Sequence, residues 1–139
     1  MSDSDERYTP RQELYDPLNR VFRFDLDPCT TQDNPLDTYN YFTKEHDGLA
    51  QSWGKLSVFV NPPYSQMRAW AVKAVQAAAD GAFVAFLIPS DPSTEAFQVL
   101  RGAAWGRWEP PFRVKCGTPD GRVVDVARGH VVFFIGGLP

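Results

Sequence analysis

The 139-residue sequence is poor in the residues that build disulfide frameworks and metal centres. It has two cysteines, Cys29 and Cys116, and two histidines, His46 and His130, without a paired Cys/His spacing. A disulfide scaffold and a zinc site are therefore not expected, and no residue is assigned to a metal. Free thiols suit a reducing compartment, so we expect a cytoplasmic protein.

Long apolar runs are also missing. No run approaches the ~20 residues of a membrane-spanning helix, so we expect no membrane segment. The sequence is nevertheless 43% hydrophobic and 14% aromatic, which is enough to build one buried core. We expect a flexible, polar and acidic tail at residues 1–8 and a single domain at residues 9–139.

The chain has no overall excess of positive charge. Its net charge of −3 argues against a protein that coats nucleic acid nonspecifically. Residues 101–139 nevertheless hold six basic and three acidic side chains, whereas residues 1–100 hold eight basic and fourteen acidic ones. Phosphate contacts from Arg107, Arg113 and Lys115 explain this pattern, and scattered arginines on a solvated hairpin explain it equally well.

The most informative stretch is a short apolar run at residues 57–60 that stops abruptly. Its β-branched and aromatic side chains predict a buried strand. The strand ends at residues that include two prolines, which cannot donate ladder hydrogen bonds. The residues of this loop are Asn61, Pro62, Pro63, Tyr64 and Ser65. The loop is expected at the carboxyl end of a strand, where open α/β sheets bind ligands.

This loop offers two hydrogen-bond acceptors beside a flat ring. The side-chain oxygen of Asn61 and the backbone carbonyl of Pro62 can each accept one hydrogen of a planar amino group, and Tyr64 can stack on the attached ring. Such a nitrogen is a poor nucleophile because its lone pair is delocalised. Acceptors on both hydrogens stabilise the positive charge that develops when the nitrogen attacks. A strong methyl donor held in line then needs only proximity and orientation.

The loop resembles the (D/N/S)PP(Y/F) catalytic motif of amino-methyltransferases that use S-adenosylmethionine. The wider sequence is similar to the compact phage-type DNA N6-adenine methyltransferases over roughly residues 9–135. The similarity rests on the loop and on Thr9-Pro10, Phe24-Asp25-Leu26-Asp27-Pro28, Asn34, Tyr41-Phe42-Thr43, Asp47-Gly48-Leu49, Trp53 and Trp70–Lys73-Ala74. It implies a compact Rossmann-like fold, S-adenosylmethionine as the methyl donor and adenine in DNA as the substrate, in a protein of phage or prophage origin.

The first expected element is a helix that begins after residue 9. Thr9 can cap it, Pro10 suits its first position, and Gln12 completes a capping box. Pro17 should end or kink this helix near Asp16. The resemblance places Thr9 and Pro10 beside the cofactor, whereas a plain helix start explains them better from the local sequence.

A strand is predicted at residues 21–26, where apolar and polar side chains alternate. Asp25 and Asp27 lie two residues apart and share its polar face, and Asp27-Pro28 ends it. A carboxylate at the strand end can accept hydrogen bonds from ribose hydroxyls or a methionine amino group. Asp27 is therefore the favoured cofactor ligand, together with Pro28, and Asp25 is the less secure one.

Glycine is missing where methyltransferases usually have a glycine-rich turn. The first glycine of the chain is Gly48, and no dinucleotide fingerprint is present. The resembled family also lacks a conventional glycine loop, so the assignment stands. Asp47 is expected to place an acid near an adenine ring, whereas Gly48 is best explained as a turn residue with positive φ.

The second half of the chain alternates between strands and helices. Residues 66–79 predict a helix, residues 82–88 a buried strand, and residues 91–100 a second helix capped by Asp91. This order predicts a parallel sheet. Two short strands, at residues 112–116 and 122–126, predict a C-terminal β-hairpin, and a last apolar strand follows at residues 130–135.

Three functions remain open at this point. A DNA adenine methyltransferase is preferred, with Tyr64 stacking on a base flipped from the duplex while Asn61 and Pro62 hold its amino group. Protein glutamine methylation uses the same loop motif, and cytosine N4 methylation is chemically close. A non-catalytic nucleic-acid-binding domain comes last, because an idle domain has no reason to keep the loop. DNA is the expected partner, and homo-oligomers are left open.

Overall fold

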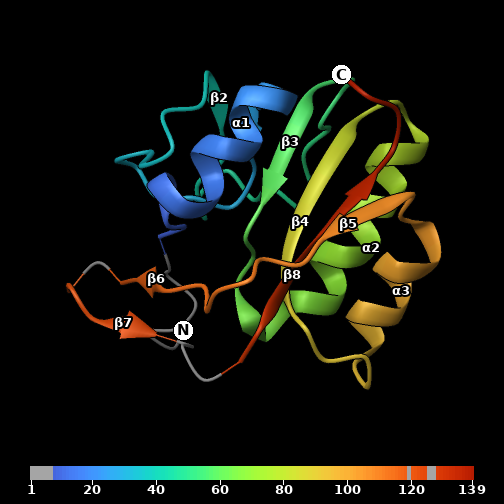
Figure 1. Ribbon diagram of the computed structural model, residues 1–139. Helices are drawn as coiled ribbons and strands as arrows, with labels where there is room; N and C mark the ends of the chain where they lie inside the picture. The colour runs from blue at the N-terminus through green and yellow to red at the C-terminus, as the bar shows by residue number, and fades with distance from the viewer. Residues whose placement is uncertain (1–7, 119, 125–127) are drawn as a thin grey trace.

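The computed structural model describes residues 8–118, 120–124 and 128–139. Six strands form its central sheet: β1 (Leu26–Asp27), β2 (Asn40–Tyr41), β3 (Ser57–Val60), β4 (Phe83–Pro89), β5 (Gly106–Trp108) and β8 (His130–Ile135). Their order across the sheet is β2-β1-β3-β4-β8-β5 (Figure 1). The first four are parallel, whereas β8 is antiparallel to both β4 and β5. The predicted α/β class with a mostly parallel sheet is confirmed.

Helices cover both faces of this sheet. On one face, a wide helical turn η2 (Arg11–Tyr15) leads into α1 (Asp16–Phe22). On the other face, α2 (Met67–Ala79) packs against α3 (Glu95–Ala103) (Figure 1). Because side chains alternate along a strand, Val58 and Val60 join the core under α2 and α3, whereas Phe59 joins the core under α1. Within the described residues, no helix has the length and apolarity that crossing a membrane requires.

The prediction of a strand at residues 21–26 is wrong for all of these residues except Leu26, which begins β1. The helix continues past Pro17 to Phe22, and Arg23 ends it in a left-handed conformation with φ 51°. Pro17 stands in the first turn of α1, where its missing N–H costs nothing. The turn before it is widened, since Tyr15 N donates to Pro10 O, five residues back, at 3.1 Å. Proline therefore reshapes the helix and does not end it.

The elements after the loop agree better with their predictions. Helix α2, the buried strand β4 and the last strand β8 are confirmed, with β8 at the predicted residues. The second helix begins later than predicted, because Thr94 caps α3 by accepting from Phe97 N at 3.3 Å. Asp91 instead accepts from Ser93 within the preceding turn. The short strands β2 and β5 were not predicted, because neither shows a regular alternation.

A separate two-stranded antiparallel sheet lies beyond the carboxyl ends of β3 and β4 (Figure 1). It consists of β6 (Cys116–Gly117) and β7 (Val123–Val124). Tyr8 is bridged to it, since its backbone N–H donates to Gly117 O at 2.7 Å and its carbonyl accepts from Gly117 N at 3.2 Å. Residues 1–7 of the predicted tail lie outside the described residues, as do parts of the second predicted hairpin strand.

Candidate active site

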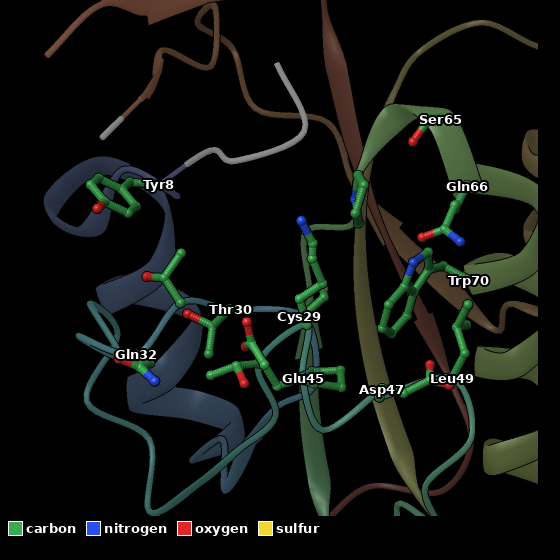
Figure 2. A pocket seen from close by; sticks show the side chains of 16 residues that line it. Tyr8, Cys29, Thr30, Gln32, Glu45, Asp47, Leu49, Ser65, Gln66 and Trp70 are labelled. Carbon is green, nitrogen blue, oxygen red and sulfur yellow. The ribbon is translucent and has the colours of Figure 1, made fainter. Parts of the chain in front are cut away.

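A cavity of about 790 Å³ lies at the carboxyl ends of β1 and β3. The loops that follow these strands line opposite sides of it, with Cys29 and Thr30 on one side and Ser65, Gln66 and Trp70 on the other (Figure 2). This volume is typical of a small-molecule site. Its lining residues are Tyr8, Pro28, Cys29, Thr30, Thr31, Gln32, Thr43, Lys44, Glu45, Asp47, Gly48, Leu49, Pro63, Ser65, Gln66 and Trp70.

Asp27 is the last residue of β1 and is buried, with 5% of its surface exposed. Its Oδ1 accepts from the backbone N–H of Cys29 at 3.4 Å. Burial raises the pKa of Asp27 to about 7, although hydrogen bonds from Cys29 and Thr30 act in the opposite direction. Asp27 therefore stands directly before the cavity-lining segment with a carboxyl group that changes charge near neutral pH.

Asp25 lies away from this cavity. Its Oδ2 accepts from the backbone N–H of Ser57 at 3.3 Å, and Ser57 is the first residue of β3. Asp25 is therefore at the amino end of the parallel strands, whereas the cavity is at their carboxyl ends. The two carboxylates that the sequence groups together are thus separated, because β1 begins only at Leu26.

Asp47 and Gly48 both line the cavity, and the turn conformation expected of Gly48 is wrong. The positive φ of 57° belongs to Asp47, not to Gly48. A Cβ on Gly48 would lie 2.0 Å from Pro28 O, so glycine is required here for the close approach of two backbones. The Gly48 carbonyl also accepts from Trp53 Nε1 at 3.0 Å, which ties this loop to the core.

Asn61 follows β3 and holds its side-chain amide in one orientation. Its Nδ2 donates to Thr9 Oγ1 at 2.9 Å and lies 3.8 Å from Cys116 Sγ. Its Oδ1 is buried and has no hydrogen-bond partner among the described residues. The backbone carbonyl of Asn61 accepts from Cys29 Sγ at 3.5 Å. The site thus contains an oriented acceptor that nothing within the described chain uses.

The prediction that Thr9 caps a helix is wrong. Pro10 occupies the cap position of η2, and no side chain caps this helix. Thr9 is instead buried, with 8% of its surface exposed, and contacts Asn61. Neither Thr9 nor Pro10 lines the cavity. The geometry thus connects Thr9 with the loop after β3.

The rest of the loop combines one buried and one half-buried proline with an aromatic ring. Pro62 is buried, and Pro63 and Ser65 line the cavity. Tyr64 begins the short helical turn η3 (Tyr64–Gln66). Its hydroxyl lies 3.4 Å from Nε2 of the buried His130, and Arg128 Cζ lies 5.4 Å from its ring centroid. Arg128 lies just before β8 and His130 is its first residue, so both contact Tyr64 from the amino end of β8.

The three basic residues predicted to contact DNA lie in two different places. Arg107 is exposed on β5, at the edge of the sheet farthest from β2. Arg113 and Lys115 are exposed in the segment before β6. Arg113 Nη1 lies 3.5 Å from the Cβ position of Gly129, next to Arg128 and the Tyr64 ring. Arg113 is therefore near the loop, whereas Arg107 is not.

Most of the cavity lining was not predicted from the sequence. Pro28 was predicted, and residues 29–32 had one available signal, since they directly follow the strand that ends at Asp27-Pro28. Thr43 and Leu49 belong to segments that carry the family resemblance, but no role was predicted for them. Lys44 and Glu45 come from a segment without periodicity and had no signal. Trp70 falls within the helix predicted at residues 66–79, and it also lines the cavity. Among the described residues, no group of three or more His, Cys, Asp or Glu is placed to hold a metal ion.

Most of this sequence is similar to that of known proteins. The model of the family described as DNA N-6-adenine-methyltransferase (Dam) matches residues 1–108, which include the whole cavity lining. A DNA N-6-adenine-methyltransferase of Escherichia phage T1 is 30% identical over 94 residues, which cover 67% of this chain and 39% of the phage protein. The chain thus spans less than half the length of that relative. The resemblance noted in the sequence is confirmed: the chain belongs to the DNA N-6-adenine-methyltransferase (Dam) family.

Proposed function

We propose that this chain transfers a methyl group from S-adenosylmethionine to the N6 amino group of adenine in DNA, on a compact Rossmann-like fold. One observation carries the proposal. Asn61 Oδ1 is a buried acceptor without a partner among the described residues, and it lies at the carboxyl end of a parallel strand beside a ligand-sized cavity. Family membership gives the reaction class in which such an acceptor has a use.

The role of Asn61 follows from the cost of a buried, unused acceptor. Such an oxygen gives up its hydrogen bonds to water without replacement, which costs about 1–3 kcal/mol. An amino hydrogen of the target base would supply the missing bond, and the Pro62 carbonyl would accept the second hydrogen. Both oxygens would then stabilise the positive charge that develops on the nitrogen during attack.

Thr9 takes the part of a positioning residue in this proposal. An amide can turn over and exchange its oxygen and nitrogen, which would present a donor to the base in place of an acceptor. The bond from Nδ2 to Thr9 Oγ1 favours the productive orientation. This assignment replaces the expected contact between Thr9 and the cofactor.

Tyr64 provides the stacking surface for the base. A target adenine in a duplex must leave the base stack before its amino group can react, and a flat side chain then supports it. The ring of Tyr64 directly follows the two prolines of the loop, and its hydroxyl is within hydrogen-bond distance of His130. Arg113 and Lys115, in the exposed segment before β6, are proposed to contact the DNA backbone.

The cavity residues fit S-adenosylmethionine. When bound, this donor supplies an electrophilic methyl group on a sulfonium sulfur. Leu49 and Trp70 give an apolar wall for a purine, and Pro28 and Asp47 also line the cavity. Asp27, the buried residue directly before this lining, is proposed to accept hydrogen bonds from hydroxyl or ammonium groups of the donor. Asp25 has no role in this proposal.

Incorporation of a labelled methyl group tests the proposal. Purified protein is incubated with unmethylated DNA and S-adenosylmethionine labelled in its methyl group, and the DNA is digested to nucleosides. Label in N6-methyl-2′-deoxyadenosine, lost in Asn61→Ala, is the expected result. Label in N4-methyl-2′-deoxycytidine would show that the proposed substrate base is wrong. A protein that binds the donor without labelling any nucleoside would refute DNA methylation and direct the search to a protein glutamine.

A further inference from the structure

The indole N–H of Trp70 is a buried donor that the rest of the described chain does not use. Trp70 lies in the first turn of α2, lines the cavity, and has 5% of its surface exposed. Its Nε1 is closed to solvent and has no hydrogen-bond partner among the described residues. A buried tryptophan N–H normally has such a partner.

The buried Trp53 follows that rule, and even the exposed Trp105 is bonded to the protein. Trp53 Nε1 donates to Gly48 O at 3.0 Å, and Trp105 Nε1 donates to Gly136 O at 2.6 Å. Trp105 is partly exposed and could use water instead, but it is bonded to the protein. Trp70, which cannot use water, is the exception. The exception coincides with the wall of the cavity in which the proposed function places the methyl donor.

The Trp70 ring is held firmly in that wall. It stacks on Trp53 with a centroid distance of 6.2 Å and an interplanar angle of 24°. Trp53 is in turn fixed to Gly48 by its own N–H, and a Cβ on Gly48 would lie 3.0 Å from Trp70 Cη2. The position of the indole is therefore set by packing, so its N–H cannot easily turn to another partner.

We infer that Trp70 Nε1–H donates a hydrogen bond to an acceptor atom of the ligand that fills this cavity. The inference rests on the proposed function, which places S-adenosylmethionine there. Both the nucleoside half and the methionine half of that molecule carry hydrogen-bond acceptors. The indole N–H therefore donates to an acceptor on one of these two halves. This contact supplies one anchor for the ligand in a site without a glycine-rich loop.

Entry of the ligand requires a small movement of the cavity wall, because the indole nitrogen is closed to solvent. Gln66 lies four residues before Trp70, on the same side of the cavity, and is exposed (Figure 2). A long, exposed amide side chain changes rotamer at low cost. Gln66 is therefore the side chain expected to move when the ligand approaches the indole.

Nuclear magnetic resonance of the indole N–H groups tests this contact directly. The chain has four tryptophans, and comparison with Trp70→Phe identifies the Trp70 signal. Addition of S-adenosylhomocysteine should move that signal downfield, as expected for a newly hydrogen-bonded N–H. Separate titrations with adenosine and with methionine show which half of the ligand carries the acceptor.

Calorimetry of ligand binding gives the matching energetic test. Replacement of Trp70 by 3-benzothienylalanine keeps the bicyclic shape and exchanges the N–H for sulfur. We expect about tenfold weaker binding of S-adenosylhomocysteine, which is the value of one net hydrogen bond. Trp105→Phe removes a tryptophan outside the cavity and serves as the control, with unchanged affinity expected.

The outcomes separate the inference from the function on which it rests. If the ligand moves other signals but leaves the Trp70 N–H unmoved, or if the benzothienyl variant binds with unchanged affinity, the contact is refuted while the binding site stands. If no signal responds to S-adenosylhomocysteine, the cavity is not the donor site, and both the proposed function and the Trp70 contact are overturned.

Discussion

The side-chain amide of Asn61 donates to the hydroxyl of Thr9, which lies 52 residues earlier in the chain, with Nδ2 2.9 Å from Oγ1. The bond joins the loop after β3 to the segment that enters the first helix. It leaves Asn61 Oδ1 without a partner among the described residues. In this arrangement the nitrogen end of the amide faces Thr9, and the oxygen end is left for a ligand.

Thr9→Val tests this orientation. Valine has nearly the same shape but cannot accept from Asn61 Nδ2, so the amide loses the bond that fixes it. We expect kcat for methyl transfer to fall about tenfold, the value of one net hydrogen bond, with little change in the affinity for S-adenosylhomocysteine. Thr9→Ser keeps the hydroxyl and should retain most of the rate. Equal rates in the valine and serine variants would contradict the role.

Tyr64→Ala tests the stacking surface. Stacking of one base on an aromatic ring is worth about 1–3 kcal/mol, so KM for DNA should rise roughly ten- to hundredfold. Tyr64→Phe keeps the ring and loses only the hydroxyl near His130, so its KM should stay much closer to that of the wild type. Steady-state kinetics at saturating donor gives both values. A Tyr64→Ala protein whose sole defect is weaker donor binding would exclude the assignment.

The raised pKa of Asp27 predicts a pH dependence of stability. In the unfolded chain the pKa of the Asp27 carboxyl is about 3.9. In the folded protein burial disfavours the charged form and raises this pKa to about 7. Between these values the unfolded state has released its proton and the folded state has not. The contribution of Asp27 to the free energy of unfolding is therefore complete below about pH 4 and is lost as the pH rises to about 7.

Denaturant unfolding of the wild type and Asp27→Asn across this range measures the effect. The stability of the wild type should fall relative to the asparagine variant between pH 4 and 7 and level off above about pH 7. A constant difference between the two proteins would mean that the folded pKa is not raised.

Gly48→Ala tests the close approach of the two cavity loops. The new Cβ would lie 2.0 Å from Pro28 O, so one of the two backbones must move. We expect a loss of about 1–3 kcal/mol in stability, as for other overpacked sites, together with weaker donor binding. Gly102→Ala is the matched control, because nothing lies within 4 Å of its Cβ position in α3. Alanine there should be neutral or stabilising. Similar stabilities for both variants would show that the loops adapt.

Much of the fold could be predicted from the sequence because strong local signals agree with the tertiary structure. The strand at residues 57–60 is entirely apolar apart from Ser57, and the helix after it has a clear apolar stripe. The end of the first helix was predicted wrongly, since a proline at the start of a helix and one that ends a helix give the same local signal. The alternation at residues 21–26 has another cause. Phe22, at the end of α1, and Phe24, in the turn after it, are both buried in the core.

The part of the candidate site predicted most completely is one contiguous segment, although Pro28 and Asp47 were also expected and line the cavity. The loop of residues 61–65 was found because its chemistry is contained in five neighbouring residues. The contacts from Thr9 and Cys116 to Asn61 depend on the long-range path of the chain, which no local pattern encodes. The same holds for Arg128 and His130 beside Tyr64.

The most direct measurement is the single-turnover rate of methyl transfer to DNA by the wild type, Asn61→Ala and Asn61→Asp. Alanine removes the buried acceptor, so the rate should fall by about 10²–10³, as when one preorganised charge-stabilising group is lost. Aspartate keeps an acceptor oxygen but loses the donor to Thr9, so it should retain an intermediate rate. Thermal unfolding should show that both variants are folded, since a loop residue contributes little core packing. A folded Asn61→Ala protein with a wild-type rate would contradict the assignment of Asn61 as the acceptor for the amino group of the base.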